Sequence, residues 1–285
     1  MNTAPTPLPD APRIAIIGTG VMGSTILTAL RVAGWPQDRI TAAARSEGNA
    51  KSVRENHGIV VELDAAAAVD GADAVILAVK PQDMATALGQ IADKVKEGAL
   101  VITVAAALPT SFYEERLPEG TPVVRAMPNT PSIVARGATG IAAGANATPS
   151  HLQLAAGMLR ATGLVVAVDE AQIDAVAAIS GSGPAYFYAF VEALTEAGVA
   201  QGLDRILATQ LAAQTLVGSA FLLQHSGESP QHLRQGVSSK GGTTLAALSA
   251  MENAGLQGVV AAGVNAAVAR ARELSHELTA TEDQA

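Results

Sequence analysis

The sequence contains no cysteine, few charged residues and no long apolar run, and each absence excludes a class of protein. Without cysteine the chain can form no disulfide, present no thiol nucleophile and offer no thiolate to a metal ion. Charged residues make up 15% of the 285 residues and the formal net charge is −8, which argues against a nucleic-acid surface and against a polybasic membrane anchor. The longest apolar run, at about residues 99–108, is well below the roughly 18 residues of a membrane-spanning helix.

Apolar residues are abundant nevertheless. They make up 49% of the chain, and the mean hydropathy is +0.28. Because the runs are short, this excess predicts a deeply buried core or an oligomer interface. The first twelve residues have neither a basic nor an apolar segment, so they do not resemble a secretory signal, and their four prolines predict a flexible tail over residues 1–12. The simplest location for such a protein is the cytoplasm.

Strand and helix patterns alternate in the first half of the chain. This alternation predicts βαβ units, and hence an α/β fold with a Rossmann-type, mostly parallel sheet that has helices on both faces. No strand is predicted beyond Val168, and the second half is expected to be an all-helical domain. The predicted domains are residues 13–168 and 169–278, followed by a tail over 279–285. The expected strands are Arg13–Ile17, Ile40–Ala44, Ala74–Val79, Leu100–Val104, Val123–Met127 and Leu164–Val168, and the expected helices include 21–33, 173–179, 184–197, 204–225 and 255–278.

The motif GTGVMG lies between the first predicted strand and the first predicted helix, which is the context of a dinucleotide-binding turn. Gly18 permits the tight turn, Gly20 lets the backbone approach a pyrophosphate, and Gly23 allows close packing of helix against strand. The alternative interpretation is a glycine turn without a ligand. The predicted contacts of the turn with a cofactor are Gly18, Thr19, Gly20, Val21, Met22 and Gly23.

The end of the second predicted strand decides between the two nicotinamide cofactors. An enzyme that uses NAD usually has an acidic residue there for the ribose hydroxyls. This chain has Arg45 and Ser46 instead, which can bind a 2′-phosphate through a guanidinium and a hydroxyl. The sequence therefore favours NADPH, with NADH as a weaker cofactor. A solvated surface arginine is the alternative interpretation of Arg45, and Glu47 stands beside it.

Three further strand ends fall at the same predicted edge of the sheet, where ligands of parallel sheets bind. The strand Ala74–Val79 ends in the motif AVKPQ, which contains Lys80. The small residues Ala105 and Ala106 leave room for a flat ring, and Asn129 in RAMPNTP can bind a nicotinamide amide or the substrate. Taken singly, each has a structural interpretation; together at one edge they indicate a site. The predicted cofactor contacts here are Ala78, Val79, Lys80, Pro81, Val104, Ala105, Ala106 and Asn129.

The run VSSKGGTTLAAL, at residues 237–248, places two glycines and two threonines directly before a helix-forming segment. Gly241 and Gly242 let the backbone approach a ligand closely. Either Thr243 or Thr244 is expected to cap the helix, whose first N–H groups lack partners within it. An anion such as a carboxylate fits at such a helix start.

Five motifs together resemble the pyrroline-5-carboxylate reductase family, whose members catalyse the last step of proline biosynthesis. They are GTGVMG, AVKPQ, RAMPNTP, SGSGPAY (Ser180–Tyr186) and VSSKGGTTLAALSAME (Val237–Glu252). The resemblance runs from about Arg13 to Leu278. One departure is Lys240, where the family commonly has proline.

The resemblance implies hydride transfer from NADPH to a cyclic imine that carries a carboxylate, giving L-proline. It implies that N–H groups of Gly242, Thr243 and Thr244 hold the carboxylate, and that the Thr244 hydroxyl contacts the ring nitrogen as the catalytic group. Ser239 and Gly241 complete the implied substrate site, and Asp64 stands where the family contacts the cofactor ribose. The helical domain is expected to form a homodimer or higher homo-oligomer, with the glycine–threonine turn facing the nicotinamide.

Two alternatives stay open. A related imine or β-hydroxyacid reductase would share the nucleotide half, although it should carry a basic residue where this chain has Ser180–Pro184. A non-catalytic protein that senses NADPH would use the same residues for binding alone. No metal is predicted, and the five histidines form no cluster in the sequence.

Overall fold

The computed structural model describes residues 11–280, which divide into two compact units. Unit 1 comprises residues 11–182 together with residues 267–280, and unit 2 comprises residues 183–266. Of the two predicted tails, residues 1–10 and 281–285 lie outside the described residues.

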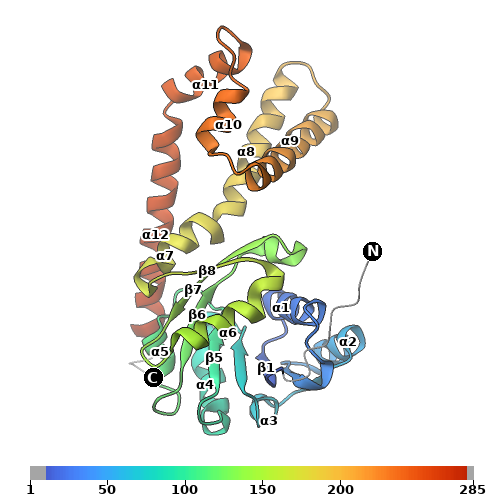
Figure 1. Ribbon diagram of the computed structural model, residues 1–285, viewed down its shortest axis with the longest axis vertical. Coiled ribbons are helices and arrows are strands. Elements are labelled where there is room, and N and C mark those ends of the chain that lie inside the picture. The colour runs from blue at the N-terminus through green and yellow to red at the C-terminus, as the bar shows by residue number, and fades with distance from the viewer. Residues whose placement is uncertain (1–10, 281–285) are drawn as a thin grey trace. The chain divides into compact units, whose positions relative to one another are not determined.

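Unit 1 is built on an eight-stranded sheet with the order β3-β2-β1-β4-β5-β6-β7-β8 (Figure 1). Neighbouring strands are parallel except β6 and β7, which are antiparallel. Strands β3 and β7 were not predicted, because β3 has only three residues and β7 is rich in glycine and alanine. The strands are β1 (Ile14–Ile17), β2 (Ile40–Ala43), β3 (Val60–Glu62), β4 (Ala74–Leu77), β5 (Leu100–Thr103), β6 (Val123–Met127), β7 (Gly137–Ala143) and β8 (Gly163–Ala167).

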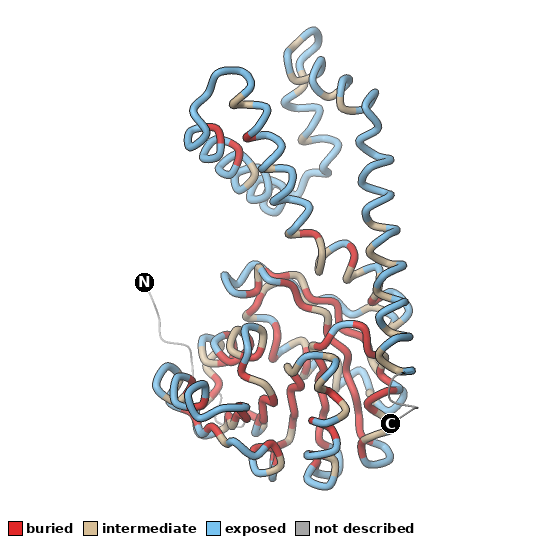
Figure 2. The backbone as a smooth tube through the Cα atoms, turned by 180° about the vertical axis from the view of Figure 1, so that it is seen from behind, coloured by how far each residue is buried: buried red, intermediate tan, exposed pale blue. Residues whose placement is uncertain are grey.

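Helices cover both faces of this sheet, as the α/β pattern predicts. In β1, Ile14 and Ile16 belong to one buried cluster and Ala15 and Ile17 to the other, since alternate side chains point to opposite faces. The buried strands form the red centre of unit 1 in Figure 2. Helices α1 (Val21–Val32), α2 (Glu47–His57) and α6 (Pro149–Leu159) pack on the first face, and α3 (Ala65–Val69), α4 (Met84–Ile91) and α5 (Thr110–Glu114) on the second.

The segment after β8 belongs to the sheet unit, so unit 1 extends to Ser182 rather than ending near Val168. Helix α7 (Ile173–Val176) continues as a π-helical turn, η7 (Ala177–Gly181). Ile173 is fully buried, and the buried Arg125 of β6 lies 3.6 Å from the Glu170 carboxylate and 3.7 Å from that of Asp174. These contacts fix the start of the predicted helical domain to the sheet.

Unit 2 consists of helices only. It contains α8 (Gly183–Ala200), α9 (Arg205–Ser226), α10 (Pro230–Gly236), α11 (Thr243–Asn253) and the first part of α12 (Leu256–Ala280). The sequence predicted all of these except the short α10. Helices α8 and α9 pack together where Gly198 meets Ala208, since a Cβ added at Gly198 would lie 3.2 Å from the Cβ of Ala208.

Few side chains of unit 2 are buried, as the pale blue helices of Figure 2 show. Large apolar side chains of α8 and α9 are exposed, including Phe187 (57%), Leu211 (52%) and Phe221 (59%). Within residues 11–280, α9 is the one helix long and apolar enough to cross a membrane by length and composition alone, a test that helices of soluble proteins also pass.

Candidate active site

The turn between β1 and α1 has the close backbone approaches that its glycines predict. Gly18 has a φ of +98°, and a Cβ there would lie 2.9 Å from the carbonyl group of Ala78. A Cβ at Gly23 would overlap the carbonyl oxygen of Gly18. Around Gly20, by contrast, nothing lies within 4 Å of the position of a Cβ. The turn is therefore packed against its own strand on one side and open at Gly20.

Gly20 is also the N-cap of α1, and no side chain caps this helix. The first turn of α1 contains no acidic residue. Its unpartnered N–H groups and the positive end of the helix dipole therefore favour an anion at Gly20. This geometry fits the pyrophosphate of a dinucleotide.

Asn49 of α2 holds the turn in place, a role that no sequence pattern indicated. Its Nδ2 donates to the Thr19 hydroxyl at 3.0 Å and to the Thr19 carbonyl oxygen at 3.4 Å. The Ser24 hydroxyl donates to the same carbonyl oxygen at 3.1 Å. Thr19 is buried, so its hydroxyl serves the conformation of the turn.

A cavity of about 540 Å³ lies at the carboxyl ends of β1, β2 and β4. Of the predicted contacts, seven line it: Gly18, Thr19, Gly20, Arg45, Ala78, Val79 and Lys80. The residues that also line it but were not predicted include Asn49, Asp83, Thr86 and Gln90. The remaining predicted contacts, which do not line the cavity, are Val21, Met22, Gly23, Ser46, Asp64, Pro81, Val104, Ala105, Ala106 and Asn129.

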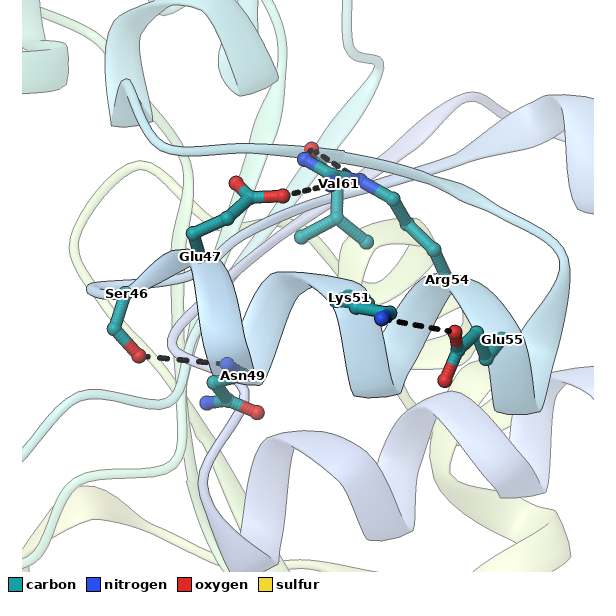
Figure 3. Close-up of polar contacts among 7 residues, drawn as sticks. All are labelled: Ser46, Glu47, Asn49, Lys51, Arg54, Glu55 and Val61. Atoms are coloured by element: carbon teal, nitrogen blue, oxygen red, sulfur yellow. Dashed lines mark hydrogen bonds and ion pairs between the residues drawn. The ribbon is translucent and has the colours of Figure 1, made fainter.

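Residues 45 to 47 follow β2 and have different partners. The Arg45 side chain is 86% exposed, and its guanidinium lies 3.1 Å from an Asp83 carboxylate oxygen. Ser46 is the N-cap of α2, and its hydroxyl accepts the Asn49 N–H at 3.4 Å (Figure 3). Glu47 pairs with Arg54 at 2.7 Å, and Arg54 also donates to the Val61 carbonyl oxygen. Glu47 is thereby held by α2 and β3, while Arg45 and Lys80 remain the cationic groups of the cavity.

Two other predicted cofactor residues have structural partners. Asp64 caps α3, since its carboxylate accepts the Ala66 N–H at 2.9 Å. The buried Asn129 donates to the Ser180 carbonyl oxygen and accepts the Ala138 N–H, both at 2.9 Å. Asn129 thus ties the end of β6 to β7 and to η7. The cofactor roles of both residues stay predictions.

The glycine–threonine turn joins α10 to α11 within unit 2. The prediction that Thr243 or Thr244 caps α11 is wrong: the N-cap is Gly242, and no side chain caps the helix. Gly241 has a φ of +75°, and a Cβ at Gly242 would lie 2.6 Å from the Ser239 hydroxyl. The positive φ of Gly241 and the close approach of Ser239 to Gly242 favour glycine at both positions, and both threonines lie in the first turn of α11.

The glycine cap has a chemical consequence. A threonine cap would satisfy one of the first N–H groups of α11, whereas glycine leaves them for a ligand. The first turn of α11 contains no acidic residue. The helix is held to α10 by the pair Arg234–Glu252 at 3.4 Å. The start of α11 is therefore a fixed position that can accept a carboxylate.

Within residues 11–280, no group of three or more His, Asp or Glu side chains is placed so that it could hold a metal ion. A mostly parallel sheet whose first glycine turn opens an uncapped helix, beside a cavity at its carboxyl edge, is typical of a dinucleotide-dependent oxidoreductase of the Rossmann type. Residues 13–107 match a family model described as NADP oxidoreductase coenzyme F420-dependent, and residues 170–274 match one described as pyrroline-5-carboxylate reductase dimerisation. The chain belongs to the pyrroline-5-carboxylate reductase family.

Similarity to the family extends over nearly the whole chain. The sequence is 40% identical to the pyrroline-5-carboxylate reductase of Pseudomonas aeruginosa over 94% of this chain and 99% of that protein. It is also 40% identical to the enzyme of Mycobacterium tuberculosis, over 92% and 96% of the two chains. The predicted family and class of enzyme are therefore confirmed.

Solved structures agree with the fold. A pyrroline-5-carboxylate reductase from Coxiella burnetii superposes with a TM-score of 0.90 at 38% identity, covering 93% of this chain and 99% of that one. The pyrroline carboxylate reductase of Plasmodium falciparum, solved with NADP bound, gives 0.80 at 26% identity and the same coverages. The predicted α/β fold followed by a helical region is confirmed. The dimerisation model covers all of α8 and α9, the helices whose apolar faces are exposed.

Proposed function

We propose that this protein reduces L-1-pyrroline-5-carboxylate to L-proline with NADPH, the last step of proline biosynthesis, and that NADH serves less well. The observation that carries the proposal is the glycine-capped start of α11, which leaves N–H groups for a carboxylate in a chain of this reductase family. The family name gives the reaction, and the capping geometry supports a role for these particular residues in it.

The residues of unit 1 suit a dinucleotide. The open position at Gly20 and the uncapped start of α1 would hold the pyrophosphate. Arg45 would hold the 2′-phosphate, and Lys80 would add positive charge at the carboxyl end of β4. When bound, a reduced nicotinamide supplies the hydride, so the protein contributes position and electrostatics.

The residues at the start of α11 suit the substrate. N–H groups of Gly242, Thr243 and Thr244 would bind the carboxylate, where the helix dipole adds up to about 2 kcal/mol in partly buried geometry. The Thr244 hydroxyl would hydrogen-bond the ring nitrogen. As the new C–H bond forms at the imine carbon, the electron pair of the C=N bond moves to this nitrogen, which takes its proton from solvent. The Thr244 hydroxyl would stabilise the amine as it forms, and Ser239 and Gly241 shape the turn.

The exposed apolar faces of α8 and α9 support assembly as a homodimer or higher homo-oligomer through the dimerisation region. Burial of these faces on a second copy removes apolar surface from water, at roughly 25 cal/mol for each Å². A soluble assembly of this kind is proposed to work in the cytoplasm, and cell fractionation tests that location.

The test of the proposed function is a coupled assay with purified protein, pyrroline-5-carboxylate and either NADPH or NADH. Proline formed in equal amount to the nicotinamide oxidised, and faster with NADPH, is the expected result. Turnover of other imines or of hydroxyacids alone would replace the proposal by a related reductase. Nucleotide binding without any turnover would replace it by a sensor.

A further inference from the structure

The pair of Arg45 and Asp83 lies across the cofactor cavity. Arg45 follows β2, while Asp83 ends η2 (Pro81–Asp83), the short turn after β4. Strand β1 lies between β2 and β4, and its glycine turn opens into the same cavity. The 3.1 Å contact between Arg45 Nη1 and Asp83 Oδ2 therefore joins the two strand ends on either side of that turn.

The charges around the cavity make Asp83 unusual. Among the described residues that line the cavity, it is the only acidic one. Glu47, the acidic neighbour of Arg45 in sequence, is paired with Arg54 on α2 (Figure 3). Asp64 is committed to the N-terminus of α3. Asp83 is thus the carboxylate that competes with an anionic ligand for Arg45.

We infer that Asp83 sets the discrimination between 2′-phosphorylated and 2′-hydroxyl dinucleotides. This inference rests on the proposed function, because it assigns Arg45 to the 2′-phosphate. A phosphate monoester carries about −1.5 to −2 charges at pH 7. To reach Arg45 it must displace the Asp83 carboxylate, and it then stays close to that negative charge. A ribose that carries only hydroxyl groups meets neither obstacle.

The pair is weak enough to be displaced. Its side chains are 86% and 41% exposed, and such pairs contribute little and are screened by salt. Asp83 therefore lowers the affinity for NADPH without preventing its binding. Replacing Asp83 by asparagine keeps the size and an oxygen acceptor but removes the charge. We expect D83N to bind NADP⁺ about three- to tenfold more tightly, and NAD⁺ with less than about a twofold change.

The test is isothermal titration calorimetry of the full chain with NADP⁺, NAD⁺ and adenosine 2′,5′-bisphosphate, a probe without nicotinamide. Wild type, D83N, R45A and the double variant are compared at low salt and at 0.5 M salt. The matched control is D93N, which removes the same charge at an exposed position in η3 (Ala92–Lys94), away from the cavity. The gain in NADP⁺ affinity from D83N should shrink in the R45A background and at high salt. D93N should show no gain in NADP⁺ affinity.

The outcomes separate the two proposals. If wild type forms proline with NADPH but D83N leaves the ratio of NADP⁺ to NAD⁺ affinities unchanged, the role of Asp83 is overturned and the proposed function stands. If D83N weakens NADP⁺ binding, Asp83 orients Arg45 for the phosphate and the competition is overturned. If wild type binds neither nucleotide and forms no proline, both proposals fail.

Discussion

Gly20 and Gly23 are only three residues apart, yet alanine should affect them differently: at position 23 it should lower stability, and at position 20 it should lower nucleotide affinity. A Cβ at Gly23 would overlap the carbonyl oxygen of Gly18, whereas one at Gly20 would meet nothing within 4 Å. Gly20 has a φ of −72°, which alanine adopts without strain. Gly20→Ala is therefore a matched control for Gly23→Ala.

The magnitudes follow from the contacts. In Gly23→Ala the obstacle is backbone, so α1 must shift away from β1; overpacking of this kind costs about 1–3 kcal/mol. The helix preference of alanine over glycine returns only about 0.5–1 kcal/mol. We expect Gly23→Ala to lower the free energy of unfolding by about 1–2 kcal/mol. Gly20→Ala should change it by less than about 1 kcal/mol, because only a helix cap is altered.

For nucleotide affinity, in contrast to stability, Gly20→Ala should be the harmful substitution. The methyl group at position 20 would occupy the open side of the turn, where the pyrophosphate is proposed to bind. Gly20→Ala should therefore weaken NADP⁺ binding by tenfold or more, on the order of 1.4 kcal/mol, in a protein of nearly unchanged stability. Urea denaturation of the free protein and calorimetric titration measure the two quantities. A Gly23→Ala protein as stable as wild type, or a Gly20→Ala protein with wild-type affinity, would refute the assignment of the two positions.

Three further predictions concern other parts of the chain. Thr244→Ala should lower kcat by about a hundredfold or more, as expected for a lost donor to developing charge, with the NADPH dissociation constant unchanged; a parallel loss of NADPH binding would contradict this role. The Asp73 carboxylate accepts from Lys96 at 2.6 Å and from the Arg13 N–H at 3.0 Å, and these contacts lower its pKa, the Lys96 bond most. The Asp73 carboxylate therefore contributes fully to stability above its ordinary pKa of 3.8, and this contribution is lost as the pH falls through the lowered pKa. Asp73→Asn should lower the free energy of unfolding by no more than about 1 kcal/mol at pH 7. The difference between variant and wild type should shrink in acid titrations below pH 3.8. The buried Thr139 hydroxyl has no hydrogen-bond partner among the described residues, so Thr139→Val should leave stability unchanged or raise it by up to about 1 kcal/mol in thermal unfolding, and a loss of more than 1 kcal/mol would show that the hydroxyl is satisfied in solution.

Local patterns predicted the parts of the fold that depend on neighbours in sequence. The glycine turn before α1 and the long helices α8, α9 and α12 lie where the residues indicate. Strands β3 and β7 were missed because pairing with β2, and with β6 and β8, stabilises them more than their own composition does. The cap of α11 falls on Gly242 rather than on a threonine, at a position where the close approach of Ser239 disfavours a side chain.

The candidate site was predictable only in part, for a similar reason. Ser46 and Asp64 carry helix-capping side chains, and this local function explains their presence without a ligand. Asn49 contacts Thr19 of the glycine turn, 30 residues away in sequence, and Asp83 contacts Arg45, 38 residues away. Those contacts depend on the order of the strands, and the sequence predicted parallel strands without predicting their order.

The path of helix α12 bears on how the chain matures during synthesis. This helix begins in unit 2, but from Ala267 onward it belongs to unit 1, where Leu278 packs against the second buried cluster and Arg272 approaches Asp174. Unit 1 is thus interrupted in sequence by the entire helical unit 2 and completed by residues that are synthesised after it. A nascent chain that stops before Ala267 lacks this segment, so unit 1 should reach its full packing only after unit 2 has been synthesised.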